Sequence, residues 1–479
     1  TELNMEKLPP KQKKPKGASR EELLKLCKEE LVDRIIQLEA HNSQLKNIIN
    51  KNLSEGAVSE SVHKNQRKFD FGKCHFRPVL LRVIYFGWDY QGFVVQEDTL
   101  QTIEYHLFKA LTTACFIESR ETAKYHRCGR TDKGVSAFGQ VISLHIRSKH
   151  CPDKQTLPDS ISSELNYCKI LNRLLPKDIR VVGWMPVPED FSARFDCKKR
   201  QYKYYFPRSS LHIDCMRESC KMLVGSHDFR NLCKMDVGNG VTEFRREILE
   251  ADIVPVDEND TDKPTSMYYL LIEGNAFLWH QIRCIQAVLL MVGSGHESAD
   301  IIESLLDLET NDRKPQYNMA VDVPLNLFKC TYEIENTTQW SYDEENLAKT
   351  IMHYQGEWTI QNVKLHCSQN RQPMGKKCDE IYGRSTGKRA TMLKDCLKTL
   401  EDKYAQLIDD KVADGTHNYG GREGRIVAYH DCLMEGVKPK QYVPLMKRST
   451  CSTLEEKIEH YRKRRKQYEP QESSKSNDS

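Results

Sequence analysis

The sequence lacks long apolar runs, and this absence excludes a membrane-spanning helix. The longest apolar stretch of the 479 residues, AFLWHQIRCIQAVLLMVG, is interrupted by His280, Gln281 and Arg283. The first residues, TELNMEKLPPKQKKPKG, contain no apolar core of the kind found in secretory signals. We therefore expect an intracellular protein that contacts no membrane. Its basic tails favour nuclear as well as cytoplasmic residence.

Paired cysteines at metal-binding spacing are also lacking, although the chain contains 17 cysteines. No CxxC pair occurs, and Cys215 with Cys220 has no second pair at the spacing of a zinc site. In a chain without a secretory signal, scattered cysteines are expected to be reduced thiols that pack as small apolar residues. The spacing therefore predicts no structural metal.

A strong net charge is the third absence, since the formal charge is only +4. The basic residues are clustered, however, in KQKKPK (11–16), CKKRQYKYYF (197–206) and RKRRK (462–466). Clustered Lys and Arg side chains can neutralise phosphates on a nearly neutral protein. For any single cluster, a solvated surface or a nuclear-import signal is an equally good explanation.

A heptad pattern follows an expected disordered basic tail at residues 1–18. In residues 19–52, leucines recur every seven positions, at Leu24, Leu31, Leu38 and Leu45, and Asn42 lies on the same seam. This pattern is typical of a coiled coil that joins two copies of the chain into a homodimer. The alternative is one amphipathic helix packed on its own domain. Residues 53–76 are polar and aperiodic, as in a linker.

Alternating strand and helix patterns occupy residues 77–335 and predict an α+β fold with a largely antiparallel sheet. We divide this region into two halves, 77–200 and 201–335. Strands are predicted at 77–87, 140–148, 179–187, 200–206, 243–254 and 266–277, and helices at 102–111, 164–176 and 278–292. Beyond it, 336–461 is polar, with a helix predicted at 391–409. We interpret it as a C-terminal extension on the body, followed by a disordered basic tail at 462–479.

The octet CGRTDKGV at 128–135 concentrates charge in a loop between apolar segments. Such loops often carry chemistry because a rigid scaffold positions them. Arg130 and Lys133 flank Asp132, so we expect this carboxyl to stay ionised at neutral pH and to be competent as a nucleophile or general base. Taken alone, an Asp-Arg pair in a loop is more often a structural ion pair.

Two further stretches favour a nucleic-acid ligand. RQYKYYF interleaves Arg200 and Lys203 with three tyrosines and a phenylalanine, which suits a surface that binds a phosphate backbone and stacks an unpaired base. NAFLWHQIR places Arg283 near the start of an apolar helix, where a lone cation is costly unless a carboxylate meets it.

The motifs resemble, in chain order, those of the TruA family of tRNA pseudouridine synthases. The similar segments are YFGWDYQGFVVQ, TIEYHLFKAL, CGRTDKGVSAFGQV, LNRLLPKDIRVVGW, FSARFDCKKRQYKYYF, LVGSHDF and GNAFLWHQIRCI. They span roughly residues 78 to 335, which makes the resemblance far more specific than one motif. It implies the pseudouridine-synthase fold, a tRNA substrate and a reaction that needs no cofactor.

The resemblance also implies roles for individual residues. Asp132 corresponds to the catalytic aspartate, and Tyr202 to a tyrosine that stacks on the target uracil. Arg283 corresponds to an arginine that pairs with the aspartate, and Arg130 to one that holds the flipped nucleotide. We expect the RNA backbone to be bound by four further basic residues, which are Lys133, Lys199, Arg200 and Lys203.

The chain departs from the bacterial pattern at Ser136, where histidine is common, and at Phe93, where tryptophan is usual. With the coiled coil and the C-terminal extension, these departures resemble the eukaryotic branch that acts on the 3′ side of the anticodon stem-loop, at about tRNA positions 38 and 39. The competing hypothesis is a non-catalytic protein that binds or chaperones structured RNA. An intact set of Asp132, Tyr202 and Arg283 favours the enzyme.

Overall fold

The computed structural model describes residues 69–259, 261–334, 340–369, 433–436 and 441–468. The chain divides into two units, residues 1–70 and 71–479, and the second unit is described here. The predicted coiled coil at 19–52, the helix at 391–409 and the two tails lie outside the described residues. Within them, no helix is both long enough and apolar enough to cross a membrane.

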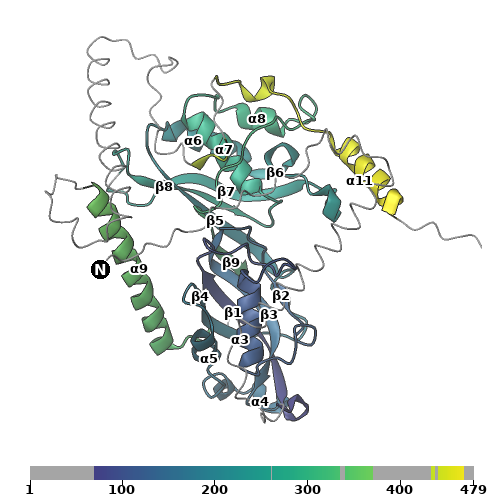
Figure 1. The fold of residues 1–479 in the computed structure, drawn as a ribbon, viewed down its shortest axis with the longest axis vertical. Helices are drawn as coiled ribbons and strands as arrows, with labels where there is room; N and C mark the ends of the chain where they lie inside the picture. Colours follow the sequence, from purple (N-terminus) through teal and green to yellow (C-terminus); the bar gives the residue numbers. More distant parts are fainter. Residues whose placement is uncertain (1–68, 260, 335–339, 370–432, 437–440, 469–479) are drawn as a thin grey trace, which may run out of the picture. The chain divides into compact units, whose positions relative to one another are not determined.

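One mixed sheet of nine strands organises the described chain (Figure 1). Eight strands lie in the order β4-β1-β3-β9-β5-β8-β7-β6, and β2 pairs with β3. Their bounds are β1 His75–Tyr85, β2 His126–Arg127, β3 Ser136–Ser148, β4 Ile179–Pro186, β5 Cys197–Pro207, β6 Gly225–Asp228, β7 Arg245–Pro255, β8 Met267–Gly274 and β9 Leu325–Tyr332. All pairs are antiparallel except β3 with β9, which confirms the α+β prediction.

Helices pack on this sheet where the apolar spacing predicts them, with some additions. The helices are α3 Ile103–Thr113, α4 Pro152–Gln155, α5 Tyr167–Leu174, α6 Ile213–Leu223, α7 Gln281–Gly293, α8 Ile301–Leu306, α9 Glu344–Gln369 and α11 Leu454–Tyr468. The Thr102 side chain caps α3 by accepting a hydrogen bond from the Tyr105 amide, and Ile103 and Leu107 share its buried face. Every residue of α7 is buried, which agrees with its mostly apolar sequence, and Gln281, Arg283 and Gln286 are buried with it.

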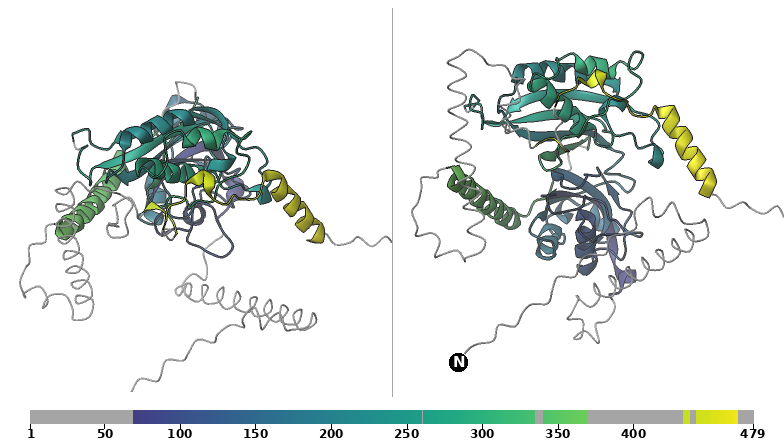
Figure 2. Two further views of the ribbon diagram at one scale, coloured as in Figure 1. Left: turned by 90° about the horizontal axis from the view of Figure 1, so that it is seen from above. Right: turned by 45° about the horizontal axis from the view of Figure 1, so that its top comes forward.

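Two large hydrophobic cores divide the sheet, and a third, smaller cluster contains Leu80, Val141 and Met185 together with Cys128 and Cys197. The first gathers side chains of β1, β3, β4, α3 and α5, and the second those of β5, β7, β8, α6 and α7. Helices α6 and α7 contact each other beside the second half of the sheet (Figures 1 and 2). The partly buried Tyr202 packs against both cores, because β5 lies next to β9 at their junction.

Two described segments of the C-terminal extension, residues 433–436 and 441–461, pack against the second core. Leu433, Leu445 and Leu454 are buried there. Main-chain bridges also join these segments to the body, between Ala320 and Met434 and between Pro315 and Thr450. A further described segment contains α9, which contacts α5 and β4. These described segments are therefore part of the body.

The turn after β1 packs closely against the 128–135 loop. A side chain at Gly87 would place its Cβ 2.0 Å from the Val135 carbonyl oxygen, a distance that no relaxed structure allows. The turn therefore fixes the height of the loop above the sheet.

The variant Gly87→Ala should consequently unfold more easily, by about 2 kcal/mol or more, because backbone must move to admit the methyl group. Gly356→Ala is the matched control, since Gly356 lies in α9 with open space around its Cβ position. We expect the control to be neutral or slightly stabilised, because alanine favours helix. Urea unfolding followed by circular dichroism checks both. Equal midpoints for the two variants would contradict the close packing.

Candidate active site

The charged loop 128–135 connects β2 to β3 and is held by side chains of the first core. The Gln140 side-chain amide makes two hydrogen bonds with Gly129. It donates to the Gly129 carbonyl at 3.0 Å and accepts from the Gly129 N–H at 3.2 Å. The Thr131 hydroxyl lies 2.8 Å from the Tyr85 hydroxyl, in a buried hydrogen bond. These bonds fix the backbone on both sides of Arg130, and so set the start of the turn that presents Asp132.

The turn after β1 holds the other end of the loop. The Phe93 N–H donates to the Thr131 carbonyl at 3.1 Å, and the Gly134 N–H donates to the Tyr90 carbonyl at 3.2 Å. Gly134 has a φ of +76°, and a Cβ there would lie 2.8 Å from the Asp322 carboxyl carbon. Glycine is therefore required at this position by both conformation and space.

Asp132 is partly buried at the tip of this loop, with 31% of its side chain exposed. Burial raises the pKa of its carboxyl, and the neighbouring Asp322 raises it further. The positive charge of Arg283 is the largest opposing influence on this pKa, followed by a hydrogen bond from the Trp279 side chain. The expected source of the counter-charge is therefore corrected from the flanking Arg130 to Arg283 of α7, while ionisation of Asp132 at neutral pH stays a prediction.

His280 is a site residue that the sequence did not single out. Its Nε2 lies 3.4 Å from Oδ2 of Asp132, and its backbone adopts a left-handed φ of 57° just before α7. Burial, followed by the positive charge of Arg283, lowers the pKa of His280 to about 4, so the imidazole is neutral at neutral pH. Its buried Nδ1 makes no hydrogen bond with the described residues. The signal in the sequence that could have indicated His280 was its position three residues before Arg283.

Arg283 is buried, as predicted, with 4% of its surface exposed. Its guanidinium forms an ion pair with Glu435 and donates to the Ala320 carbonyl at 2.8 Å. Among the described residues, no direct ion pair links Arg283 to Asp132, and the predicted contact is corrected to a longer-range electrostatic one. The physical reason is the C-terminal segment, which pairs with Met319 and brings a carboxylate to the buried cation.

Tyr202 borders the same loop. Its ring packs edge-on against Phe277 at a centroid distance of 5.2 Å. Its hydroxyl would lie 3.9 Å from a Cβ placed on Gly129, three residues before Asp132. Burial raises the pKa of Tyr202 well above its ordinary value, so the phenol stays neutral. The structure therefore brings Tyr202, Arg283 and the Asp132 loop into one region.

Strand alternation separates Lys199 and Lys203 from Tyr202. Between Arg200 and Pro207, β5 pairs with β8 in regular register, so successive side chains face opposite sides of the sheet. On the face away from Tyr202, Lys203 lies over the rings of Tyr269 at 4.2 Å and Phe328 at 4.0 Å. Lys199 pairs with Glu273 at 3.3 Å. These two lysines therefore do not lie on the face that carries Tyr202.

The Arg200 side chain is engaged in hydrogen bonds to the main chain. Its guanidinium donates to four main-chain carbonyls, those of Cys128, Arg194, Cys197 and Asn275. With most of its donors engaged, it has little capacity for a phosphate. Its role is to join the base of the charged loop to the start of β5.

Three exposed basic residues, Arg130, Lys133 and Lys234, lie around the charged loop. Arg130 and Lys133 are exposed, and the pKa of Arg130 is lowered by burial of its inner part and by the nearby cations Arg127 and Arg194. Exposed Lys234 lies over the Trp279 ring at 4.4 Å and acts on the Asp132 pKa. The region around Asp132 is therefore a positive rim that suits a polyanionic ligand.

The ion pair of Arg283 with Glu435 predicts how Asp132 titrates. In Glu435→Gln, one negative charge near the site is lost and Arg283 acts on Asp132 without neutralisation. The pKa of the Asp132 carboxyl should then fall, as read from the carbon-13 shift of the labelled carboxyl during a pH titration. The control Glu345→Gln, at an exposed pair with Lys169, should leave that pKa unchanged. A pKa that rises in Glu435→Gln would contradict this electrostatic coupling.

Comparison with known proteins agrees with this geometry. Residues 219–333 match a family model described as tRNA pseudouridine synthase. The human tRNA pseudouridine(38/39) synthase is 40% identical over 91% of this chain and 88% of its own length. The Saccharomyces cerevisiae tRNA pseudouridine(38/39) synthase is 36% identical over 70% of this chain and 79% of its own.

An archaeal relative is similar over a shorter range. The tRNA pseudouridine synthase A of Thermococcus onnurineus is 32% identical over 49% of this chain and 78% of its own length. The shared motifs, the mixed sheet and the identity along nine-tenths of the chain lead to one conclusion. The chain belongs to the TruA family of tRNA pseudouridine synthases.

Proposed function

We propose that the protein isomerises uridine to pseudouridine at positions 38 and 39 of tRNA, with Asp132 as the catalytic residue. The observation that carries the proposal is the placement of the Asp132 carboxyl. It is partly buried on a rigid loop and lies within the electrostatic reach of the buried Arg283. The target position is supported by the human and yeast relatives, which are tRNA pseudouridine(38/39) synthases.

The chemistry fits the side chains of this loop and of α7. Pseudouridine formation breaks the bond from the ribose C1′ to N1 of uracil and forms a bond from C1′ to C5. The C5 proton leaves and N1 gains a proton, so the isomerisation has no net gain or loss of groups or electrons. A carboxylate can serve as nucleophile or general base in such a reaction. Neutral His280, 3.4 Å from Asp132, offers a second group that can accept or donate a proton.

The target base must leave its stack before it can react, which costs a few kcal/mol. A neutral tyrosine at the edge of the loop, Tyr202, suits stacking on the flipped uracil. The exposed cations Arg130, Lys133 and Lys234 suit attraction of the flanking phosphates, because they remain in contact with solvent around Asp132. Binding free energy from these contacts offsets the unstacking.

A non-catalytic RNA-binding protein is the weaker candidate. Burial of a carboxylate is unfavourable for folding and adds nothing to the attraction of phosphates. Asp132 is nevertheless held in a partly buried position that raises its pKa, with the charge of Arg283 as the largest opposing influence. This arrangement has a use in catalysis and none in simple binding.

We also propose that residues 19–52 form a coiled coil that joins two chains into a homodimer, and that the protein resides in the nucleus and the cytoplasm. The heptad leucines support the first proposal, and the basic clusters at 11–16 and 462–466 support the second. Dimerisation would let one subunit bind the tRNA body while the other presents its active site.

The variant Asp132→Asn tests the catalytic proposal. It keeps the size of the side chain but removes its charge, so the single-turnover rate of pseudouridine formation should fall by about 10⁴-fold or more. The Kd for tRNA should stay unchanged or tighten slightly, because a carboxylate repels phosphates. The control Asp214→Asn, an exposed residue of α6, should keep the normal rate. A normal rate in Asp132→Asn would refute the assignment.

Deletion of residues 19–52 tests the dimer. The mass measured by light scattering should halve, because the seam leucines are removed. Deletion of residues 1–18 is the control and should leave the mass unchanged. If the full chain and the 19–52 deletion have the mass of one chain each, the coiled coil does not join two copies.

A further inference from the structure

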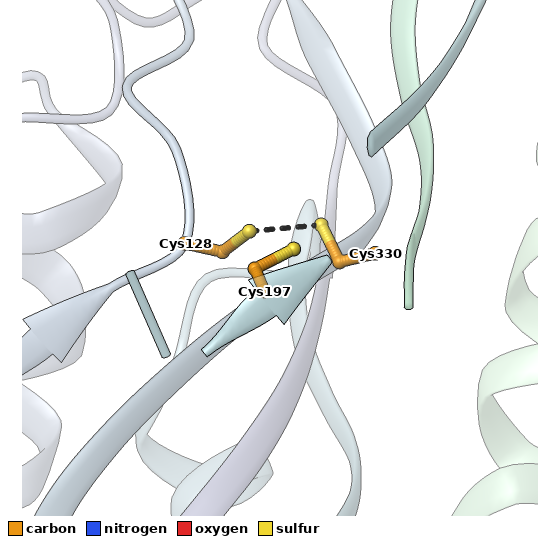
Figure 3. Close-up of side chains that lie close together, drawn as sticks. All are labelled: Cys128, Cys197 and Cys330. Atoms are coloured by element: carbon orange, nitrogen blue, oxygen red, sulfur yellow. Dashed lines mark hydrogen bonds between the residues drawn. The ribbon is translucent and has the colours of Figure 1, made fainter. Parts of the chain in front are cut away.

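Three cysteines that lie far apart in the sequence meet beneath the charged loop (Figure 3). The Sγ atoms of Cys128, Cys197 and Cys330 all lie within 4.8 Å of one another. The Sγ atoms of Cys128 and Cys330, 202 positions apart, are separated by 3.2 Å. Cys128 and Cys197 are buried, and Cys330 is partly buried. Spacing along the chain gave no sign of this cluster, because strand pairing assembles it.

We propose that Cys128, Cys197 and Cys330 bind one Zn²⁺ ion as thiolates. In a tetrahedral zinc site with Zn–S bonds of about 2.3 Å, two sulfurs are about 3.8 Å apart. The Sγ atoms of the cluster are already gathered at such separations, with the closest pair at 3.2 Å and all within 4.8 Å. Small side-chain rotations therefore suffice for coordination. This proposal replaces the spacing-based prediction that the chain binds no metal.

The surroundings of the cluster balance its charge. Three thiolates and one Zn²⁺ carry a net charge of −1, which is costly in a buried place without a cation. Arg200 supplies that cation, since its guanidinium donates to the main-chain carbonyls of Cys128 at 3.2 Å and Cys197 at 3.5 Å. Its position beside the thiols explains why an arginine is held here by carbonyl oxygens rather than by a carboxylate.

Three thiolates leave one position of a tetrahedral zinc site for an oxygen ligand. The Lys199 carbonyl oxygen lies 3.4 Å from Cys197 Sγ, and a water molecule is the other source of oxygen. A site closed by three sulfurs and one oxygen is structural when the reacting groups lie elsewhere. Asp132 and Tyr202 are such groups, and neither belongs to the cluster.

The three segments explain what the metal would stabilise. Cys128 is the first residue of the charged loop, Cys197 begins β5, and Cys330 lies on β9. Asp132 follows the first cysteine by four residues, and Tyr202 follows the second by five. A zinc ion would therefore link the loop that carries Asp132 to β5, the strand that carries Tyr202. Its free energy of binding would add to the stability of the fold.

The metal content of the full-length protein tests the proposal. The protein is purified under reducing conditions from medium that contains zinc, and bound zinc is measured by mass spectrometry of the ions. We expect close to one zinc ion per chain, released when a mercurial reagent blocks the thiols. Replacement of zinc by Co²⁺ should give the intense thiolate-to-metal absorption of a tetrahedral sulfur site. This second measurement needs no variant to fold.

Cysteine variants locate the ion. Cys197→Ser should lose most of the zinc and show a lower Tm. Cys215→Ser, which is exposed, and Cys168→Ala, which is buried in the first core, should keep the zinc content. The proposal is overturned if the wild type holds no zinc and gives no sulfur-to-cobalt absorption. It is equally overturned if Cys197→Ser keeps full zinc, or if the protein purified under reducing conditions still contains a Cys128–Cys330 disulfide in place of metal.

Discussion

A guanidinium buried in an apolar helix is the constraint on which the site depends. Every residue of α7 is buried, and Arg283 is 4% exposed within it. A cation in this position destabilises the fold unless anions approach it. Glu435 meets it directly from the C-terminal segment, while Asp132 lies within its electrostatic reach. One buried charge thus couples the charged loop, the long helix and residues 433–436 of the extension.

The same constraint explains why the described part of the extension is integrated into the body. Residues 433–436 pair with residues 319–321, and Leu433 is buried in the second core. This pairing holds Glu435 in reach of Arg283 with 41% of the Glu435 side chain exposed. The Glu435 carboxylate therefore balances the buried Arg283 while it remains in contact with solvent.

Much of the fold and the central loop could be predicted from the sequence. Period-two and helical spacing gave most strands and helices, and the motifs indicated Asp132, Tyr202 and Arg283 as neighbours. The need of Arg283 for a carboxylate also followed from its apolar surroundings. That the carboxylate is Glu435 could not be predicted, because the two residues are 152 positions apart and only tertiary pairing joins them.

Other residues grouped with the site in the sequence lie apart from it or have other partners, for physical reasons that are visible in the fold. Strand alternation places Lys203 on the face opposite Tyr202, a rule that the interleaved RQYKYYF pattern already contained. Arg200 is engaged by carbonyl oxygens, which a composition argument cannot detect. His280 was overlooked because a single histidine in an apolar segment is usually a core residue. Its left-handed backbone, seen only in the structure, is what aims it at Asp132.

The central claim is that Asp132 reacts as a carboxylate whose pKa is raised by burial, and the pH dependence of the wild-type single-turnover rate tests it most directly. The rate of pseudouridine formation should be constant near neutral pH and fall as the pH drops through a pKa above the ordinary aspartate value of 3.8. Because His280 titrates at about 4, the same limb must persist in His280→Gln. The claim would be contradicted by a rate that stays constant as the pH falls to about 3.8 while the protein remains folded. It would also be contradicted if the acidic limb of the pH profile disappears in His280→Gln.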